Sequence, residues 1–314
     1  MPAPGLTFHL PPDARLRYLL NLCAALQQLG NPVCKTRIAL IARARQAAEI
    51  PKRQEVGDFA HRLGLIEHVP EGWQLSPLAF QILLHEHPVQ RDLLHYLAYS
   101  AWTWETASTA PFWSYQHTVD YLWTCSRVDL STHTHDLVEE VRVSSRTVFE
   151  GYPNYVAEKV VYNIHSVRGV LQWLRELDPP VIVERLFARR QTCSAELIAL
   201  ALGLAARQAG IGTGNDLLLS QERREAVCRI CLLEPGYLDR LLDWAIPRFP
   251  ELLAPGMRGG SYGRSVRLLR IPAVEDLAQG RKYPRGHVAG DLRDVRQDTA
   301  QSHYVHMQRS GSSG

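Results

Sequence analysis

The stretch GLIEHVPEGWQLSPLAF, residues 64–80, constrains the fold more than any other part of the sequence. The segment before it carries apolar side chains at the i, i+3, i+4 and i+7 spacing of an amphipathic helix, at Val56, Phe59, Ala60 and Leu63. Gly64 ends that helix, and LIEH and WQLS are predicted to pair as strands around the turn-forming VPEG. The stretch therefore predicts a tight antiparallel hairpin directly behind a helix.

Two more helices are predicted before this one. Residues 13–30 place leucines and a cysteine on one helical stripe, which is typical of a helix packed on a core. Residues 35–49 predict a shorter, more basic helix with Ile38 and Ile41 facing the core. After the hairpin, a further apolar helix is expected over residues 77–104, interrupted at a proline.

Three helices, a two-stranded hairpin and a following helix are the element order of a winged helix-turn-helix. Residues Leu16 to Phe80 resemble that superfamily, particularly in the "helix, Gly-Leu-Ile, hairpin, x-Leu-Ser-Pro" arrangement common in its prokaryotic members. The continuation SPLAFQILLHEHPVQRDLLHYLAYSAWTW, followed by PFWSYQHTVDYLW, resembles a poorly characterised group of prokaryotic proteins encoded beside DNA-modification and phage-defence genes. The resemblance implies a DNA-binding module in the N-terminal quarter and a role in antiviral defence.

The predicted fold class is mainly α: an N-terminal winged helix-turn-helix, a helical second domain with a few short strands, and a basic tail. The expected domains are residues 1–105, 106–277 and 278–314. SVRLLRI, residues 265–271, is the best strand candidate in the second half, so a second, degenerate winged helix near residues 160–275 stays open beside the favoured all-helical bundle. Residues 126–155 are expected to be loosely structured, and the final SGSSG is compatible with a cloning remnant.

A local excess of positive charge accompanies the hairpin. Residues 13–64 carry nine basic side chains against four acidic ones, the charge pattern expected where a winged helix contacts phosphates. The helix before the hairpin would enter the major groove, so its outer face should read base edges. The candidate base-reading residues are Gln54, Asp58 and His61. The candidate phosphate contacts are Lys35, Arg43, Arg45, Lys52, Arg53 and Arg62.

Two turns that contain glycine are relevant to the predicted nucleic-acid binding. The hairpin tip presents Glu71 and His68 and no arginine or lysine, so the wing is expected to support the helix rather than enter a minor groove. GMRGGSYGRS, residues 256–265, offers Arg258 and Arg264 as further candidate nucleic-acid contacts on a flexible backbone. A solvent-exposed loop before a strand is the alternative interpretation of that segment.

The sequence predicts no catalytic centre, cofactor or metal site. Cys228 and Cys231 form a C-x-x-C that lacks the second ligand pair of a zinc site, so they are expected to pack within a helix. HTHD, residues 133–136, is the least implausible metal site and is better explained by solvated loop residues. H-E-x-x-H and Walker A motifs are absent from the sequence.

Composition completes the expectation about function. The chain is 46% hydrophobic and 21% charged, carries no secretion signal and lacks an apolar run of roughly 18 to 20 residues, so a cytoplasmic protein without a membrane partner is expected. The leading hypothesis is a non-catalytic, double-stranded-DNA-binding accessory or regulatory protein. The alternatives are an interaction scaffold that uses the winged helix and the aromatic helical block, and a non-catalytic subunit of a nucleic-acid-processing complex. Protein partners in a multi-subunit system and a homodimer stay open.

Overall fold

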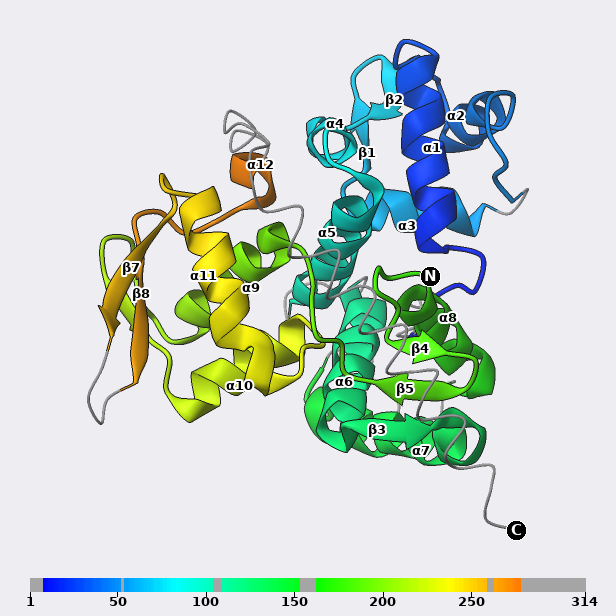
Figure 1. Cartoon of the computed structure of the whole chain (residues 1–314). Coiled ribbons are helices and arrows are strands. Elements are labelled where there is room, and N and C mark those ends of the chain that lie inside the picture. The colour runs from blue at the N-terminus through cyan, green and yellow to red at the C-terminus, as the bar shows by residue number, and fades with distance from the viewer. Residues whose placement is uncertain (1–7, 52–53, 104–108, 153–161, 259–262, 278–314) are drawn as a thin grey trace, which may run out of the picture. The chain divides into compact units, whose positions relative to one another are not determined.

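The computed structural model describes residues 8–51, 54–103, 109–152, 162–258 and 263–277. Residues 1–278 form one compact unit, and residues 279–314 form a second. The predicted tail, residues 278–314, lies outside the described residues, as do Lys52 and Arg53. Within the described part the fold is mainly helical with a few short strands in small sheets, which confirms the predicted fold class at that level (Figure 1).

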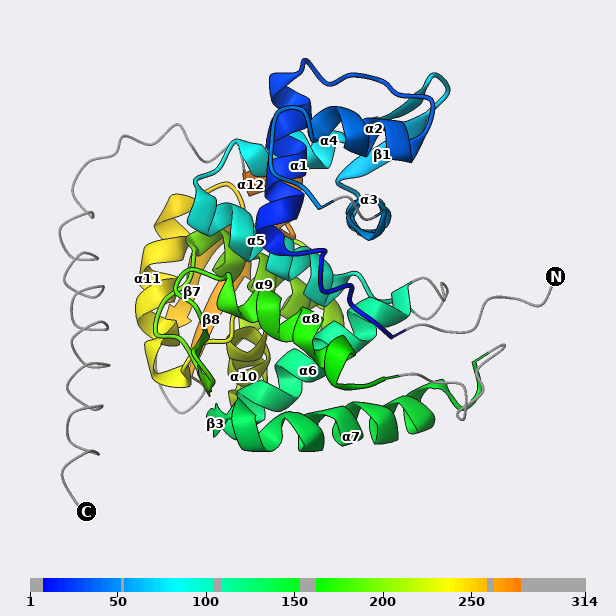
Figure 2. The same ribbon diagram turned by 90° about the vertical axis from the view of Figure 1, so that its right-hand side faces the viewer.

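The first module, residues 16–75, contains the predicted helices and hairpin. Its elements are α1 (Leu16–Gln28), α2 (Arg37–Ala44), α3 (Glu55–Arg62), β1 (Ile66–Val69) and β2 (Gly72–Leu75). The two strands pair antiparallel, with Ile66 opposite Leu75 and Val69 opposite Gly72. Cys34 adds a third extended segment, because its N–H donates to the Trp73 carbonyl (2.9 Å) and its carbonyl accepts from the Trp73 N–H (2.7 Å). Strand β2 therefore lies between Cys34 and β1; Figure 2 shows α2 and α3 beside this hairpin.

A helical middle section follows the first module. Its helices are α4 (Pro77–Leu83), α5 (His87–Ser100), α6 (Ala110–Cys125), α7 (Leu130–Phe149) and α8 (Ile164–Arg175). Its strands β3 (Arg127–Asp129), β4 (Ile182–Val183) and β5 (Leu186–Ala188) form a sheet in the order β3-β5-β4. No helix among the described residues is long and apolar enough to cross a bilayer.

Helix α7 overturns the expectation that residues 126–155 are loose. The Asp129 side chain caps the helix by accepting from the Ser131 N–H (2.8 Å). Only a narrow stripe of its twenty residues is buried, including Leu137, Val141 and Phe149. His133 and His135 are solvent-exposed as expected, but they lie on a helix rather than in a loop.

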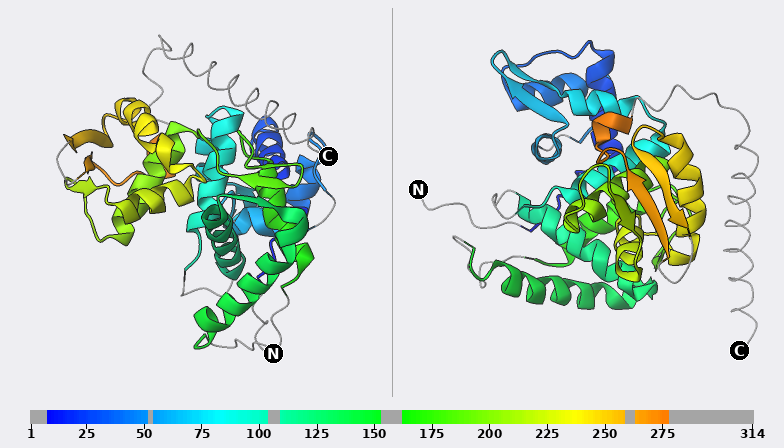
Figure 3. Two further views of the ribbon diagram at one scale, coloured as in Figure 1. Left: turned by 60° about the horizontal axis from the view of Figure 1, so that its bottom comes forward. Right: turned by 90° about the vertical axis from the view of Figure 1, so that its left-hand side faces the viewer.

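The second module, residues 195–268, ends the described chain apart from a short helix. Its elements are α9 (Ala195–Gln208), β6 (Asp216–Leu218), α10 (Gln221–Ile230), the 3-10 turn η3 (Pro235–Tyr237), α11 (Leu238–Arg248), β7 (Leu253–Arg258) and β8 (Arg264–Leu268). The sheet order is β6-β8-β7, and the β7–β8 hairpin lies beside α11 (Figure 3, right). Strand β8 confirms the strand predicted in SVRLLRI. Helix α12 (Val274–Leu277) follows.

The two modules repeat one topology. Each runs from a helix through an extended segment to two helices and an antiparallel hairpin. In each, the extended segment pairs with the last strand, which therefore lies in the middle of the sheet: Cys34-β2-β1 in the first module and β6-β8-β7 in the second. Residues 195–268 thus carry a three-stranded sheet beside their helices rather than forming the favoured all-helical bundle, and the second, degenerate winged helix stays a prediction.

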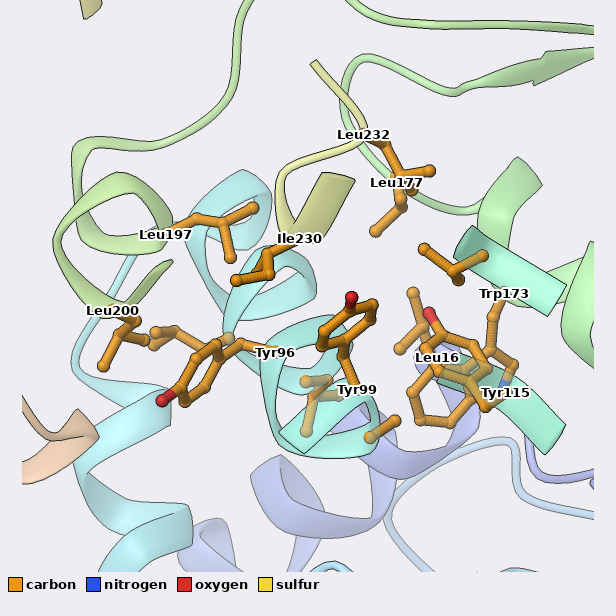
Figure 4. Close-up of a cluster of buried hydrophobic side chains, with 14 of the residues drawn as sticks. Leu16, Tyr96, Tyr99, Tyr115, Trp173, Leu177, Leu197, Leu200, Ile230 and Leu232 are labelled. Atoms are coloured by element: carbon orange, nitrogen blue, oxygen red, sulfur yellow. The ribbon is translucent and has the colours of Figure 1, made fainter. Parts of the chain in front are cut away.

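Helix α5 connects the modules through a buried polar and aromatic core. Figure 4 shows Tyr99 of α5 between Ile230 of α10 and Tyr115 of α6, with Tyr96 of α5 beside Leu200 of α9. The Asp92 carboxylate binds Arg190 Nη1 at 2.8 Å and accepts from the Ser194 N–H at the start of α9 (2.8 Å). Because the Asp92 and Arg190 side chains are each 1% exposed, this ion pair is an interior connection between distant parts of the chain.

Candidate nucleic-acid interface

Helix α3 is held by its apolar face, as its spacing predicts. Val56, Phe59, Ala60 and Leu63 are all buried, and the Phe59 ring meets the Trp173 ring edge-on at 5.6 Å between centroids. Helix α2 crosses α3 closely at Gly57, where an added Cβ would stand 2.9 Å from Ile41 Cγ1. Packing on both sides therefore fixes which residues of α3 face outward.

The structure places the three predicted base-reading residues in different situations. Gln54 precedes α3 and is exposed. Asp58 is half-buried and forms an ion pair with Arg37 at 2.5 Å, and the Arg37 guanidinium lies 5.0 Å from the centre of the Trp73 indole. His61 is exposed, but its Nδ1–H donates to the Ile66 carbonyl (3.2 Å) and its ring lies edge-on to Trp73 at 4.8 Å. Asp58 and His61 thus join α3 to α2 and to the hairpin.

The predicted phosphate contacts that the structure describes lie on α2 and α3. Lys35, Arg43, Arg45 and Arg62 are all exposed. Arg43 Nη1 donates to Gln46 Oε1 (2.8 Å), and Arg45 Nε donates to the Ile50 carbonyl (3.2 Å). Thr36 caps α2 by accepting from the Ala39 N–H (3.1 Å) and is itself exposed, so Lys35 flanks an accessible helix N-terminus.

The hairpin tip has the composition expected of a supporting wing. His68 and Glu71 are exposed, and no lysine or arginine occurs between Ile66 and Leu75. The His68 ring lies 5.2 Å from Trp73, on the same indole that His61 and Arg37 approach. Trp73 therefore anchors the hairpin to both helices.

Two arginines among the described residues of the second module, Arg224 and Arg264, are paired with carboxylates of α11. Arg264, predicted to contact nucleic acid, instead binds Asp243 Oδ1 at 2.8 Å and the Asp239 carboxylate at 3.6 Å, with its side chain only 12% exposed. Arg224 of α10 binds both oxygens of Asp239, at 3.0 and 2.7 Å. These hydrogen bonds lower the pKa of Asp239 below its usual value. Charge pairing within the module therefore engages the Arg264 guanidinium, and its contact with nucleic acid stays a prediction.

Arg258, the other candidate in this module, ends strand β7. Its side chain and residues 259–262, the glycine-rich connection to β8, lie outside the described part of the structure.

Buried titratable groups elsewhere serve the core. Cys228 and Cys231 are 0% exposed, which confirms the predicted helix packing, and burial raises the pKa of Cys228 to about 12. His95 is fully buried between Tyr115 and the Ile230 carbonyl. Across the described ranges, no group of three or more His, Cys, Asp or Glu side chains is placed to hold a metal ion.

The position of Ile38 on α2 contradicts the prediction that this residue faces the core. Ile38, predicted to face the core, is 62% exposed, whereas Leu40, Ile41 and Ala44 are buried. A helical projection places Ile38 outside the face that those three buried residues define, so the projection, rather than the hydrophobicity of the residue, carries the signal.

Scans against family models, characterised proteins and solved structures found no match to this chain.

Proposed function

We propose that the first module is a winged helix-turn-helix that binds double-stranded DNA. The chain then acts as a non-catalytic accessory or regulatory protein. Its assignment to a prokaryotic defence or DNA-modification system rests on the sequence resemblance of residues 76–123 alone.

The observation that carries this proposal is the joint placement of α2 and α3. In a helix-turn-helix the third helix of the module faces the major groove and the preceding helix approaches the backbone. Here the exposed Arg62 lies at the end of α3, and Lys35 flanks the exposed N-terminus of α2. A helix N-terminus with a neighbouring cation suits a phosphate group.

Fewer residues remain available to contact base edges than the sequence predicts. Gln54 is exposed and can pair with an adenine edge through its amide. Asp58 is committed to Arg37, so its proposed role changes from reading cytosine to fixing α3 against α2. Because few side chains remain to read bases, we expect phosphate contacts to dominate the affinity.

The experiment is a salt series of duplex binding by the full chain and by Lys35→Glu/Arg62→Glu. Each lost phosphate contact should reduce the slope of log K against log salt by about 0.9, so the double variant should lose roughly two units. The matched control is Arg185→Glu/Arg240→Glu, which reverses the same number of exposed charges outside the first module.

Two results would contradict the proposal. One is wild-type duplex binding that is absent or independent of salt. The other is an equal loss in the control pair and in the Lys35/Arg62 pair, because that would indicate only a response to net charge.

A further inference from the structure

The outward face of α2 is apolar. Four of its residues are exposed, namely Ile38, Ala39, Ala42 and Arg43. Three of these four are hydrophobic, and Ile38 at 62% is more exposed than the other large hydrophobic side chains described as exposed. The chain before the helix adds Val33, which is 45% exposed. A side chain as large as isoleucine in this position leaves apolar surface in water without contributing to the core.

The topology itself does not require this apolar face. Helix α10 occupies the same place in the second module as α2 does in the first. Its exposed residues are Gln221 and Glu222, and charged Arg223 and Glu225 are half-exposed. Because the same helix position accepts a polar surface in the second module, the topology does not require the apolar surface of α2.

Cations border the apolar face of α2. Lys35 precedes the helix, and Arg43 lies one turn beyond Ala39 on the exposed side. Asp58, which forms an ion pair with Arg37 of this helix, lies on its half-buried side. The border of the face is therefore positively charged.

We propose that the outward face of α2 docks an acidic amphipathic helix of a partner protein. Apolar side chains of the partner cover Ile38 and Ala42, and its carboxylates pair with Lys35 and Arg43. This inference does not require the proposed DNA binding, because Ile38 offers little to a phosphate backbone, although Lys35 and Arg43 are candidate contacts in both proposals.

A second copy of this chain fits the face less well. In a two-fold contact the same patch meets itself, which would bring Lys35 and Arg43 towards the same cations of the other copy. Like charges placed opposite each other in an interface oppose association. Charge complementarity therefore favours an acidic partner.

The test uses the full chain and three synthetic peptides of equal length. The probe has leucines at i, i+3, i+4 and i+7 among glutamates and alanines; one control scrambles that sequence, and the other replaces its glutamates with lysines. Fluorescence anisotropy should show that the probe binds at least tenfold more tightly than either control. The scrambled control keeps the charge of the probe, so it separates helical amphipathicity from electrostatic attraction.

Variants of the chain then locate the site. Ile38→Asp and, separately, Lys35→Glu/Arg43→Glu should each weaken binding of the probe at least tenfold. Val183→Asp is the matched control, because Val183 is 44% exposed on β4 and lies outside the first module. Ile38→Asp should leave the melting temperature unchanged, since the side chain is largely in solvent.

Three outcomes would overturn the proposal. The first is equal binding of the probe and the scrambled peptide, and the second is unchanged binding by Ile38→Asp. The third is a wild-type dimer in sedimentation that Ile38→Asp converts to a monomer, which would assign the face to a second copy. Failure of duplex binding with retained peptide binding would reject only the proposed function.

Discussion

At the scale of single residues, the sheet of the first module depends on Gly72. Its φ of 143° lies outside the range that other residues adopt readily, and an added Cβ would collide with the Cys34 carbonyl oxygen. Gly72→Ala should therefore break the Cys34–Trp73 pairing and lower the free energy of unfolding by about 2 to 4 kcal/mol.

Urea denaturation of Gly72→Ala and Gly30→Ala separates the cost of backbone strain from the cost of the collision with Cys34. Gly30 also has a positive φ, 75°, but no atom lies within 4 Å of its added Cβ. Its substitution should cost only the backbone strain, about 1 to 2 kcal/mol. Equal losses for the two variants would show that the close approach to Cys34 is unimportant.

His95 makes stability depend on pH. Its burial, followed by the charge of Arg190, lowers its pKa from 6.5 to about 4. Between these values the unfolded chain binds a proton at this site and the folded chain does not, so the free energy of unfolding falls as the pH falls. The contribution approaches about 1.4 kcal/mol per pH unit, or about 3 kcal/mol in all.

Asp120 has the opposite effect on how the free energy of unfolding depends on pH. Burial raises its pKa from 3.8 to about 6, although Tyr99 donates a hydrogen bond to it (2.6 Å). Between these values the folded chain retains the proton, so this contribution to stability is lost as the pH rises. Unfolding at pH 5 and 7 should show a smaller increase with pH in His95→Gln and a larger one in Asp120→Asn. Parallel profiles for both variants and the wild type would contradict the assignment.

At the scale of elements, Ser76 explains why a Ser-Pro pair follows the hairpin. Its hydroxyl donates to the Gly64 carbonyl (2.5 Å) and accepts from the Ala79 N–H (3.2 Å), so it joins the end of α3 to the start of α4. Ser76→Ala removes a cap and leaves a carbonyl without this donor, and should lower the free energy of unfolding by about 1 to 3 kcal/mol.

Ser220→Ala is the matched control for Ser76→Ala. Ser220 caps α10 by accepting from the Arg223 N–H (3.4 Å), and it is exposed. Chemical denaturation should show a loss of about 0.5 to 1 kcal/mol for this variant. A loss at Ser76 no larger than at Ser220 would contradict the joining role.

Elements could be predicted where the pattern was local. The spacing of Val56 to Leu63, the stop at Gly64 and the turn VPEG each determine structure within a few residues, and β1, β2 and α3 follow them. Helix α7 was missed because its buried stripe is narrow and serines, threonines and histidines fill the rest. The prediction that Ile38 faces the core is wrong because Leu40 and Ile41 define the inner face of α2, and hydrophobicity alone does not show which side a residue is on.

At the scale of the whole molecule, the Asp92–Arg190 pair should matter more than any surface charge. Asp92→Ala would leave Arg190 buried without its partner, at a cost of about 3 to 5 kcal/mol. The double variant Asp92→Leu/Arg190→Met should recover part of that loss, because it buries no charge. Thermal unfolding of the three proteins tests this, and a double variant less stable than Asp92→Ala would refute it.

The sequence leaves the shared topology of the two modules open as an alternative and does not favour it. Its extended segments are short, a single bridge at Cys34 in one module and three residues of β6 in the other. The surface residues also differ, since the carboxylates of Asp239 and Asp243 pair with Arg224 and Arg264 in the second module. The candidate site could be predicted only in part from the sequence. The ion pair of Asp58 with Arg37, which the sequence pattern does not indicate, decides which polar side chains of α3 remain free to contact DNA.

The ion pair between Arg37 and Asp58 has a mechanical consequence. Together with the close crossing at Gly57, it links α2 to α3, and the ion pair of Arg224 with Asp239 links α10 to α11. We expect a tilt imposed on the second helix of either module to be passed on to the third helix. Whatever binds α2 therefore also sets the pitch at which α3 meets its own ligand.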